Sequence, residues 1–309
     1  MKFALHALFT LCFAAVLLLS GAVSAQQTTD PVQRLKLPGL NEYAPAGSGG
    51  KLNQAPGTIN LAAQLSTDAP DVTRGLIWRI FGPEPGPDGK LPLIATAEGG
   101  SSAFELAPGS YLVHAAFGRA GATKRITLAT GEQRQESVVL DAGGLKLDAV
   151  LSGGVRIPPE KLRFSIYEAE AEAGEERRLV VPNVNPRTVV RLNAGTYHVV
   201  SKYGNVNAII RSDIRVEAGK LTEAVVEHRA AQLTMKLVRE AGGEAIADTQ
   251  WSILTESGDI VRESVGAFAS MVLAEGTYTI NARNRDRNYQ RDFTVVAGRN
   301  QDVEVLTTE

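Results

Sequence analysis

Apolar and polar residues alternate along most of the chain, and the alternation keeps the same register in three separate places. Mostly apolar side chains occupy every second position from Tyr111, from Tyr197 and from Tyr278. A period of two residues is typical of β-strands with one buried face. The pattern therefore predicts an all-β protein in which these tyrosines point inward. No segment after residue 25 shows the apolar spacing of an amphipathic helix.

The alternating strands belong to a unit that occurs three times. Each unit opens with an alternating run, continues with an aromatic-x-Ile step, and then carries the motif Leu-x-x-Gly-x-Tyr at residues 106–111, 192–197 or 273–278. An internal repeat of this length indicates a tandem array. Several short strands with regular turns indicate that each unit is a β-sandwich. We place the units at residues 56–143, 144–230 and 231–309.

Two aromatic positions in each unit are predicted to be structural. The aromatic residue of the aromatic-x-Ile step has the same place in all three units, which indicates a packing role in the core. The tyrosine of the Gly-x-Tyr step resembles the tyrosine corner of immunoglobulin-like sandwiches, in which the hydroxyl bonds back to the preceding corner. The predicted structural residues are Trp78, Tyr111, Phe164, Tyr197, Trp251 and Tyr278.

The Leu-x-x-Gly-Thr-Tyr strand resembles that of bacterial immunoglobulin-like and transthyretin-like repeats, which include carboxypeptidase regulatory-like domains. The resemblance extends over all three units. It implies three tandem immunoglobulin-like β-sandwiches that serve as a spacer, stalk or binding module rather than as a catalyst. The chain departs from antibody domains because it lacks their cysteine pair, since its one cysteine is Cys12.

The N-terminal segment differs in composition from the repeats. Lys2 precedes an apolar core at residues 11–19, and small residues follow at positions 23–25. This order is typical of a secretory signal peptide, so we expect cleavage after Ala25 and a periplasmic mature chain; an uncleaved membrane anchor is the alternative. Residues 26–55 are rich in Gln, Pro, Gly and Ser, which predicts a flexible, disordered tether. No later apolar stretch is long enough to form a transmembrane segment.

Charge and motifs argue against several functional classes. The formal net charge is −2, whereas nucleic-acid binders usually carry a strong basic excess. His114, His198 and His228 fall in different places of the repeats, and we expect them to be solvent-facing structural residues. The sequence has no phosphate-loop, dinucleotide or nucleophile-elbow motif, so we predict no enzyme, no cofactor and no metal site. A hydrolase with a catalytic triad scattered along the sequence is an alternative.

One loop of the third unit carries an unusual charge. Residues 283–291 lie between two predicted strands and contain four arginines against Asp286, whereas the equivalent loops of the other units are nearly uncharged. Guanidinium groups bind carboxylates and phosphates through paired hydrogen bonds, and a tyrosine offers a flat contact face. The alternative is a soluble hairpin whose charges balance those of its neighbours. The predicted partner-binding residues are Arg283, Arg285, Arg287, Tyr289 and Arg291.

These features together predict a non-enzymatic periplasmic envelope scaffold or interaction protein. Its partner would be an envelope protein or an anionic glycan, and no nucleic acid. The alternative function is that of a carbohydrate-binding module for peptidoglycan or an acidic polysaccharide. The connections between the units are short, as at residues 141–144, and we expect them to limit movement between neighbouring units.

Overall fold

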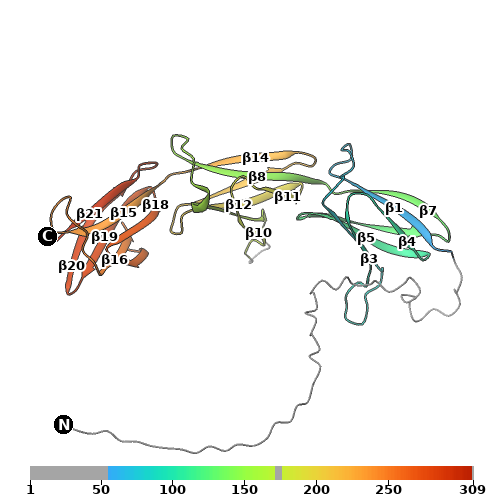
Figure 1. The fold of residues 1–309 in the computed structure, drawn as a ribbon, viewed down its shortest axis with the longest axis horizontal. Helices are drawn as coiled ribbons and strands as arrows, with labels where there is room; N and C mark the ends of the chain where they lie inside the picture. The colour runs from blue at the N-terminus through green and yellow to red at the C-terminus, as the bar shows by residue number, and fades with distance from the viewer. Residues whose placement is uncertain (1–54, 171–175, 308–309) are drawn as a thin grey trace, which may run out of the picture. The chain divides into compact units, whose positions relative to one another are not determined.

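The computed structural model describes residues 55–170 and 176–307, and these form three β-sandwiches in succession along the chain (Figure 1). Each sandwich has one sheet of three strands and one sheet of four. The predicted all-β fold with three tandem sandwiches is confirmed. The predicted signal peptide and nearly all of the predicted tether lie outside the described residues. Among the residues that are described, no helix is long and apolar enough to cross a membrane.

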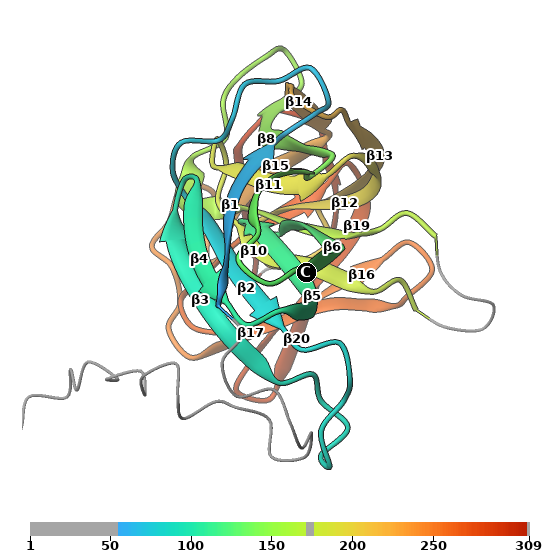
Figure 2. The same ribbon diagram turned by 90° about the vertical axis from the view of Figure 1, so that its right-hand side faces the viewer.

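The first sandwich is built from seven strands. They are β1 (Gly57–Gln64), β2 (Leu76–Phe81), β3 (Leu93–Gly99), β4 (Ser102–Leu106), β5 (Gly109–Phe117), β6 (Ala120–Leu128) and β7 (Gln133–Val139). The sheets have the orders β4-β1-β7 and β3-β2-β5-β6. β1 pairs antiparallel with β4 and parallel with β7. In Figure 2 β1 passes in front of β2, and Ile59 and Trp78 from these two strands enter the same core.

The second sandwich has the same plan, with a short 3-10 turn added. Its elements are β8 (Ala142–Leu151), η2 (Pro159–Lys161), β9 (Leu162–Glu168), β10 (Leu179–Val184), β11 (Val189–Asn193), β12 (Gly195–Tyr203), β13 (Ile209–Val216) and β14 (Leu221–His228). The sheets have the orders β11-β8-β14 and β10-β9-β12-β13. As in the first sandwich, the opening strand lies at the centre of its sheet, because β8 pairs antiparallel with β11 and parallel with β14.

The third sandwich repeats the plan once more. Its strands are β15 (Ala230–Val238), β16 (Thr249–Thr255), β17 (Ile260–Val265), β18 (Phe268–Ala274), β19 (Gly276–Asn284), β20 (Arg287–Val295) and β21 (Gln301–Leu306). The sheets have the orders β18-β15-β21 and β17-β16-β19-β20. The last two strands of the four-stranded sheet carry the loop that the sequence marks as a candidate site.

Each sandwich encloses its own hydrophobic core between its two sheets. Trp78, Phe164 and Trp251 lie at the centres of these cores, with exposed fractions of 0%, 0% and 1%. Burying apolar surface contributes about 25 cal/mol per Å², so residues of this size dominate the stability of a small sandwich. The alternation along the strands produces these cores because every second side chain enters the space between the sheets.

The three motif tyrosines make the same hydrogen bond. Each hydroxyl donates to the backbone carbonyl four residues earlier, at 2.5 Å for Tyr111, 2.9 Å for Tyr197 and 2.9 Å for Tyr278. This bond is the one that defines a tyrosine corner. It fixes the corner between two strands.

Candidate functional site

The candidate site is the hairpin at residues 283–291, called the arginine hairpin below. Strands β19 and β20 form it, and their pairing brings Asn284 opposite Arg287, with Arg285 and Asp286 as a two-residue turn between them. Arg285 has a φ of 53°, which lies in the left-handed region that glycine or asparagine usually occupies in such turns. The turn therefore holds an exposed arginine at the tip of the hairpin.

The four arginines do not share one face of the hairpin. Arg291 pairs with the buried Ile280, and residues opposite each other on paired strands point to the same face. Arg291 thus lies over the edge of the sandwich, where its guanidinium donates a hydrogen bond to the backbone carbonyl of Glu304 in β21. Arg283 follows the buried Ala282 in β19 and so points to the opposite, outer face.

Three of the arginines are available for a ligand. Arg283, Arg285 and Arg287 are exposed and form no ion pair with any described residue. Asp292, a candidate for balancing their charge, forms no ion pair with any of the described arginines and accepts a hydrogen bond from a threonine hydroxyl of β19 at 2.7 Å. Tyr289 is half-buried and packs against the third core, so only part of its ring can contact a ligand. The positive charge of the hairpin is therefore free to bind a carboxylate or phosphate.

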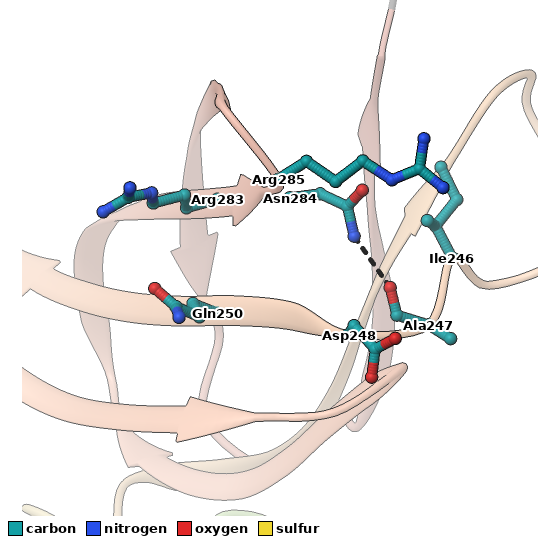
Figure 3. A pocket seen from close by; sticks show the side chains of 7 residues that line it. All are labelled: Ile246, Ala247, Asp248, Gln250, Arg283, Asn284 and Arg285. Carbon is teal, nitrogen blue, oxygen red and sulfur yellow. Dashed lines mark hydrogen bonds between the residues drawn. The ribbon is translucent and has the colours of Figure 1, made fainter.

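An open hollow of about 550 Å³ lies beside the arginine hairpin (Figure 3). The side-chain amide of Asn284 donates to the backbone carbonyl of Ala247 at 2.7 Å and to a threonine hydroxyl at 3.2 Å. Figure 3 shows Arg283 and Arg285 extending in opposite directions from either side of Asn284. The lining thus combines guanidinium and amide groups with the carboxylate of Asp248, a set suited to a polar ligand.

The equivalent hairpin of the first sandwich contacts the second sandwich, and we call this contact the first joint. The backbone N–H of Arg119 donates to the carbonyl of Arg191 at 3.0 Å. The amide of Asn193 donates to the carbonyls of Gly121 and Leu140 at 3.2 and 2.8 Å. Its side-chain oxygen accepts from the N–H of Gly121 at 3.2 Å. One asparagine therefore ties the hairpin, the connecting segment and the next sandwich together.

The hairpin of the second sandwich makes a similar contact with the third, the second joint. Asn207 donates to the hydroxyl of Tyr278 at 2.8 Å and accepts from the backbone N–H of Ala274 at 3.0 Å. Val272 of the third sandwich packs within the second core. The sequence showed only that these two hairpins carry little charge. Asn193 of β11 and Asn207 of the second hairpin were missed because their partners are far from them in the sequence.

The histidines lie apart and have separate partners. His114 is 2.9 Å from the hydroxyl of Thr123, and His198 is 2.7 Å from the carboxylate of Asp213; both are half-buried on outer faces of their sheets. Within residues 55–170 and 176–307, no group of three or more His, Cys, Asp or Glu side chains could hold a metal ion.

The expectation of a solvent-facing His228 is wrong. The alternation of β14 continues to its last residue, so His228 points inward on the same face as Ala224 and Val226. Its ring is buried, lies edge-on to Tyr203, and is 2.8 Å from the hydroxyl of Ser201. Burial disfavours the charged imidazolium and lowers the pKa of His228 to about 4.

Comparison with known families matches one part of the chain. Residues 232–307, which make up most of the third sandwich, match the Rhizobiales growth-associated tandem repeat domain. No curated protein matches the chain. The match supports the prediction that the third sandwich is one unit of a tandem repeat. The narrower resemblance to transthyretin-like repeats stays a prediction.

Comparison with solved structures finds weak similarity to several bacterial proteins. The Bacillus anthracis TIE protein is 17% identical, with 82% of this chain and 50% of that chain covered and a TM-score of 0.25. A streptococcal ancillary pilin is 12% identical over 81% of this chain and 98% of its own, with a TM-score of 0.29. The minor pilin GBS52 of Streptococcus agalactiae is 12% identical over 56% and 95%, with a TM-score of 0.31. Similarities this weak carry no function over to this chain.

Proposed function

We propose that this protein is a non-enzymatic scaffold of the periplasmic envelope whose third sandwich binds an acidic envelope protein. The observation that supports this function is the contrast between three equivalent hairpins. Two of them hold neighbouring sandwiches together, whereas the third presents Arg283, Arg285 and Arg287 without an ion pair to any described residue. Exposed guanidinium groups attract an acidic surface and fix its orientation through paired hydrogen bonds.

The chemistry of the hairpin favours binding over catalysis. A nucleophile or general base must reach the reacting atom of a substrate. The hydroxyl–imidazole pair of Ser201 and His228 is buried, so a substrate has no access to it. The hollow beside the hairpin offers guanidinium and amide groups, which recognise a ligand, and one carboxylate, Asp248, with no nucleophilic side chain beside it in the lining. Export to the periplasm is proposed from the signal-like pattern of residues 1–25.

The test is the recovery of a partner from living cells by chemical crosslinking. We expect the variant R283E/R285E/R287E to recover at least tenfold less of a specific partner, because the reversed charges repel an acidic surface. Arg291 is left unchanged because it bonds to β21. The matched control is R125E/R211E/R262E, which makes the same charge change at exposed positions, one in each sandwich. Equal recovery by the hairpin variant would contradict the proposed site.

The alternative function is binding of peptidoglycan or an acidic polysaccharide. It is favoured by the open hollow beside the hairpin, where Gln250 and Asn284 offer amides next to two arginines. Sedimentation with purified sacculi separates the two functions. A protein scaffold stays in the supernatant, whereas a carbohydrate-binding module sediments with the sacculi and is released by the hairpin substitutions.

A further inference from the structure

The two joints share a close contact at one glycine of the upstream hairpin. Gly118 and Gly204 both have left-handed backbone conformations, with φ values of 68° and 72°. A Cβ atom on Gly118 would lie 2.9 Å from Cβ of Arg191, and one on Gly204 would lie 2.8 Å from Cβ of Val272. Each distance is shorter than a normal carbon–carbon contact. Both hairpins therefore need glycine here, because the next sandwich occupies the space of a side chain.

The joints also share a contact in the opposite direction. Gly219 of the second sandwich and Gly298 of the third have φ values of 71° and 73°. A Cβ on Gly219 would lie 3.0 Å from the hydroxyl oxygen of Ser66, and one on Gly298 would lie 3.0 Å from the carbonyl oxygen of Ser152. The two serines have the same place in their sandwiches. Each lies seven residues after a buried residue of the opening strand, Ile59 in β1 or Leu145 in β8. A small residue at this place lets the downstream turn approach.

A third shared position is aromatic. Phe117 and Tyr203 each precede the hairpin glycine. Phe117 is half-buried and Tyr203 is buried. In the first joint the guanidinium of Arg191 lies 4.4 Å from the centroid of the Phe117 ring, a cation–π distance. The downstream face of the first two sandwiches thus has an aromatic residue, a glycine and a serine at matching positions.

The third sandwich has different residues at all three of these positions. Arg285 lies nine residues after the motif glycine Gly276, as Gly118 and Gly204 do after theirs. Asn284 replaces the aromatic residue, and Glu240 replaces the serine. Both Arg285 and Glu240 are exposed. The φ of Arg285 keeps the backbone of the turn in the same left-handed region, so the backbone is retained while the side chains differ.

We propose that the third sandwich is the end cap of the array, and that Glu240, Asn284 and Arg285 stop a further repeat from docking on its downstream face. A side chain at position 285 would collide with the next sandwich in the joint geometry. Closing the joint would also bury the charges of Arg285 and Glu240, which is costly without partners. Polar outer faces are the usual property of terminal repeats. The inference rests on these three residues and is independent of the proposed partner.

The test adds a fourth sandwich to the full chain. A second copy of residues 229–309 follows Thr307, which is the register equivalent of His228. Arg229 then provides a trypsin site at both junctions. In the native joint Ala230, which follows the bond that trypsin would cut, is fully buried in the core of the second sandwich, so a closed joint protects this segment from cleavage.

We expect trypsin to cut the added junction at least tenfold faster than the native one, because the cap keeps the new joint open. Adding E240S, N284F and R285G to the first copy of the third sandwich should remove this difference. Replacing R285G by R285A in that background should restore fast cleavage, since the Cβ alone blocks the joint. Equal protection of both junctions without substitutions, or no protection with R285G, would overturn the proposal.

A reverse experiment covers the case in which the substituted fusion does not fold. Gly204→Arg in the unfused chain should open the second joint and accelerate cleavage after Arg229 at least tenfold. The matched control is Gly89→Arg, because Gly89 has a φ of 73° but no atom within 4 Å of its Cβ position. Unchanged cleavage of the Gly204→Arg variant would show that a side chain at the hairpin tip does not block a joint.

Discussion

Trp78 and Trp251 are buried side chains that each need one polar partner. Their indole N–H groups donate to the carbonyls of Gly100 at 2.8 Å and Gly266 at 2.9 Å. A buried N–H without an acceptor would cost about 1–3 kcal/mol. Phe164 fills the same place in the second sandwich and has no polar atom to satisfy. A fully buried aromatic ring is therefore the property that the three cores share.

His228 makes stability depend on pH at the residue scale. Its pKa is lowered by burial to about 4 in the folded protein, whereas an unfolded histidine has a pKa of about 6.5. The neutral form is therefore favoured by folding. Its contribution is complete above pH 6.5 and is lost progressively as the pH falls toward 4, because the unfolded state takes up the proton first.

We expect this effect to reach about 2–3 kcal/mol at pH 4.5, from about 1.4 kcal/mol for each pKa unit. The measurement is the free energy of unfolding by denaturant at pH 7 and pH 4.5. His228→Gln keeps a polar group near Ser201 but does not titrate. The native protein should lose more stability than this variant over the same interval, and equal losses would show that His228 does not control the change.

Alternation along the strands predicts the inward face of the motif strands, although Tyr197 is only half-buried and Val200 is buried against the alternation. Tyr111 and Tyr278 are buried as their register indicates, because successive side chains of a strand point to opposite faces. His228 was misplaced although the same rule covers it. It is the last residue of β14 and lies beside a joint. The prediction relied on the joint and not on the alternation of the strand, which places His228 on the buried face. The error was in the interpretation, since the signal was present in the sequence.

At the scale of elements, the hairpin between the last two strands of each four-stranded sheet is the variable part. It ends in Gly118 and Gly204 where it contacts another sandwich, and in Arg285 in the third sandwich, where the hairpin forms no hydrogen bond or ion pair with another sandwich among the described residues. The strands on either side keep the same pairing in all three sandwiches. A turn of a few residues can therefore change its contacts without disturbing the sheet.

Asn207 provides a test of the second joint. Asn207→Ala removes its hydrogen bonds to Tyr278 and Ala274. The N–H of Ala274 then loses its acceptor, and leaving such a group unpaired costs about 1–3 kcal/mol. Differential scanning calorimetry should show the third sandwich unfolding in an earlier, separate transition. The neighbouring exposed Asn205 supplies the control, since Asn205→Ala removes no such bond. Identical calorimetric profiles for the two variants would argue against a stabilising role of Asn207.

The sequence indicated that the arginine hairpin differs from its two equivalents, but not why the equivalents are uncharged. The reason is a contact with residues about 70 positions away along the chain, such as Asn193 with Gly121. Local sequence patterns do not reveal contacts between residues that are so far apart along the chain. The shared glycine nine residues after the motif glycine was visible as a turn signal, although its role in a joint required the neighbouring sandwich.

At the scale of the whole molecule, a repeated fold carries one hairpin that differs from its two equivalents, the proposed binding surface. Repetition explains the three cores and the two similar joints, since each sandwich is one unit of a tandem array. The identity of a partner depends on a surface that occurs only once. The family match covers a single sandwich, so it does not supply that identity, and the arginine hairpin is the feature from which we propose it.

The most direct measurement is site-specific photocrosslinking in living cells. A photoreactive amino acid at Asn288, exposed on the arginine hairpin, is compared with one at Asn60, exposed on β1 of the first sandwich. We expect one acidic envelope protein to be captured from position 288 and not from position 60. We also expect R283E/R285E/R287E to abolish this capture. Capture of the same proteins from both positions would contradict a binding site at the hairpin.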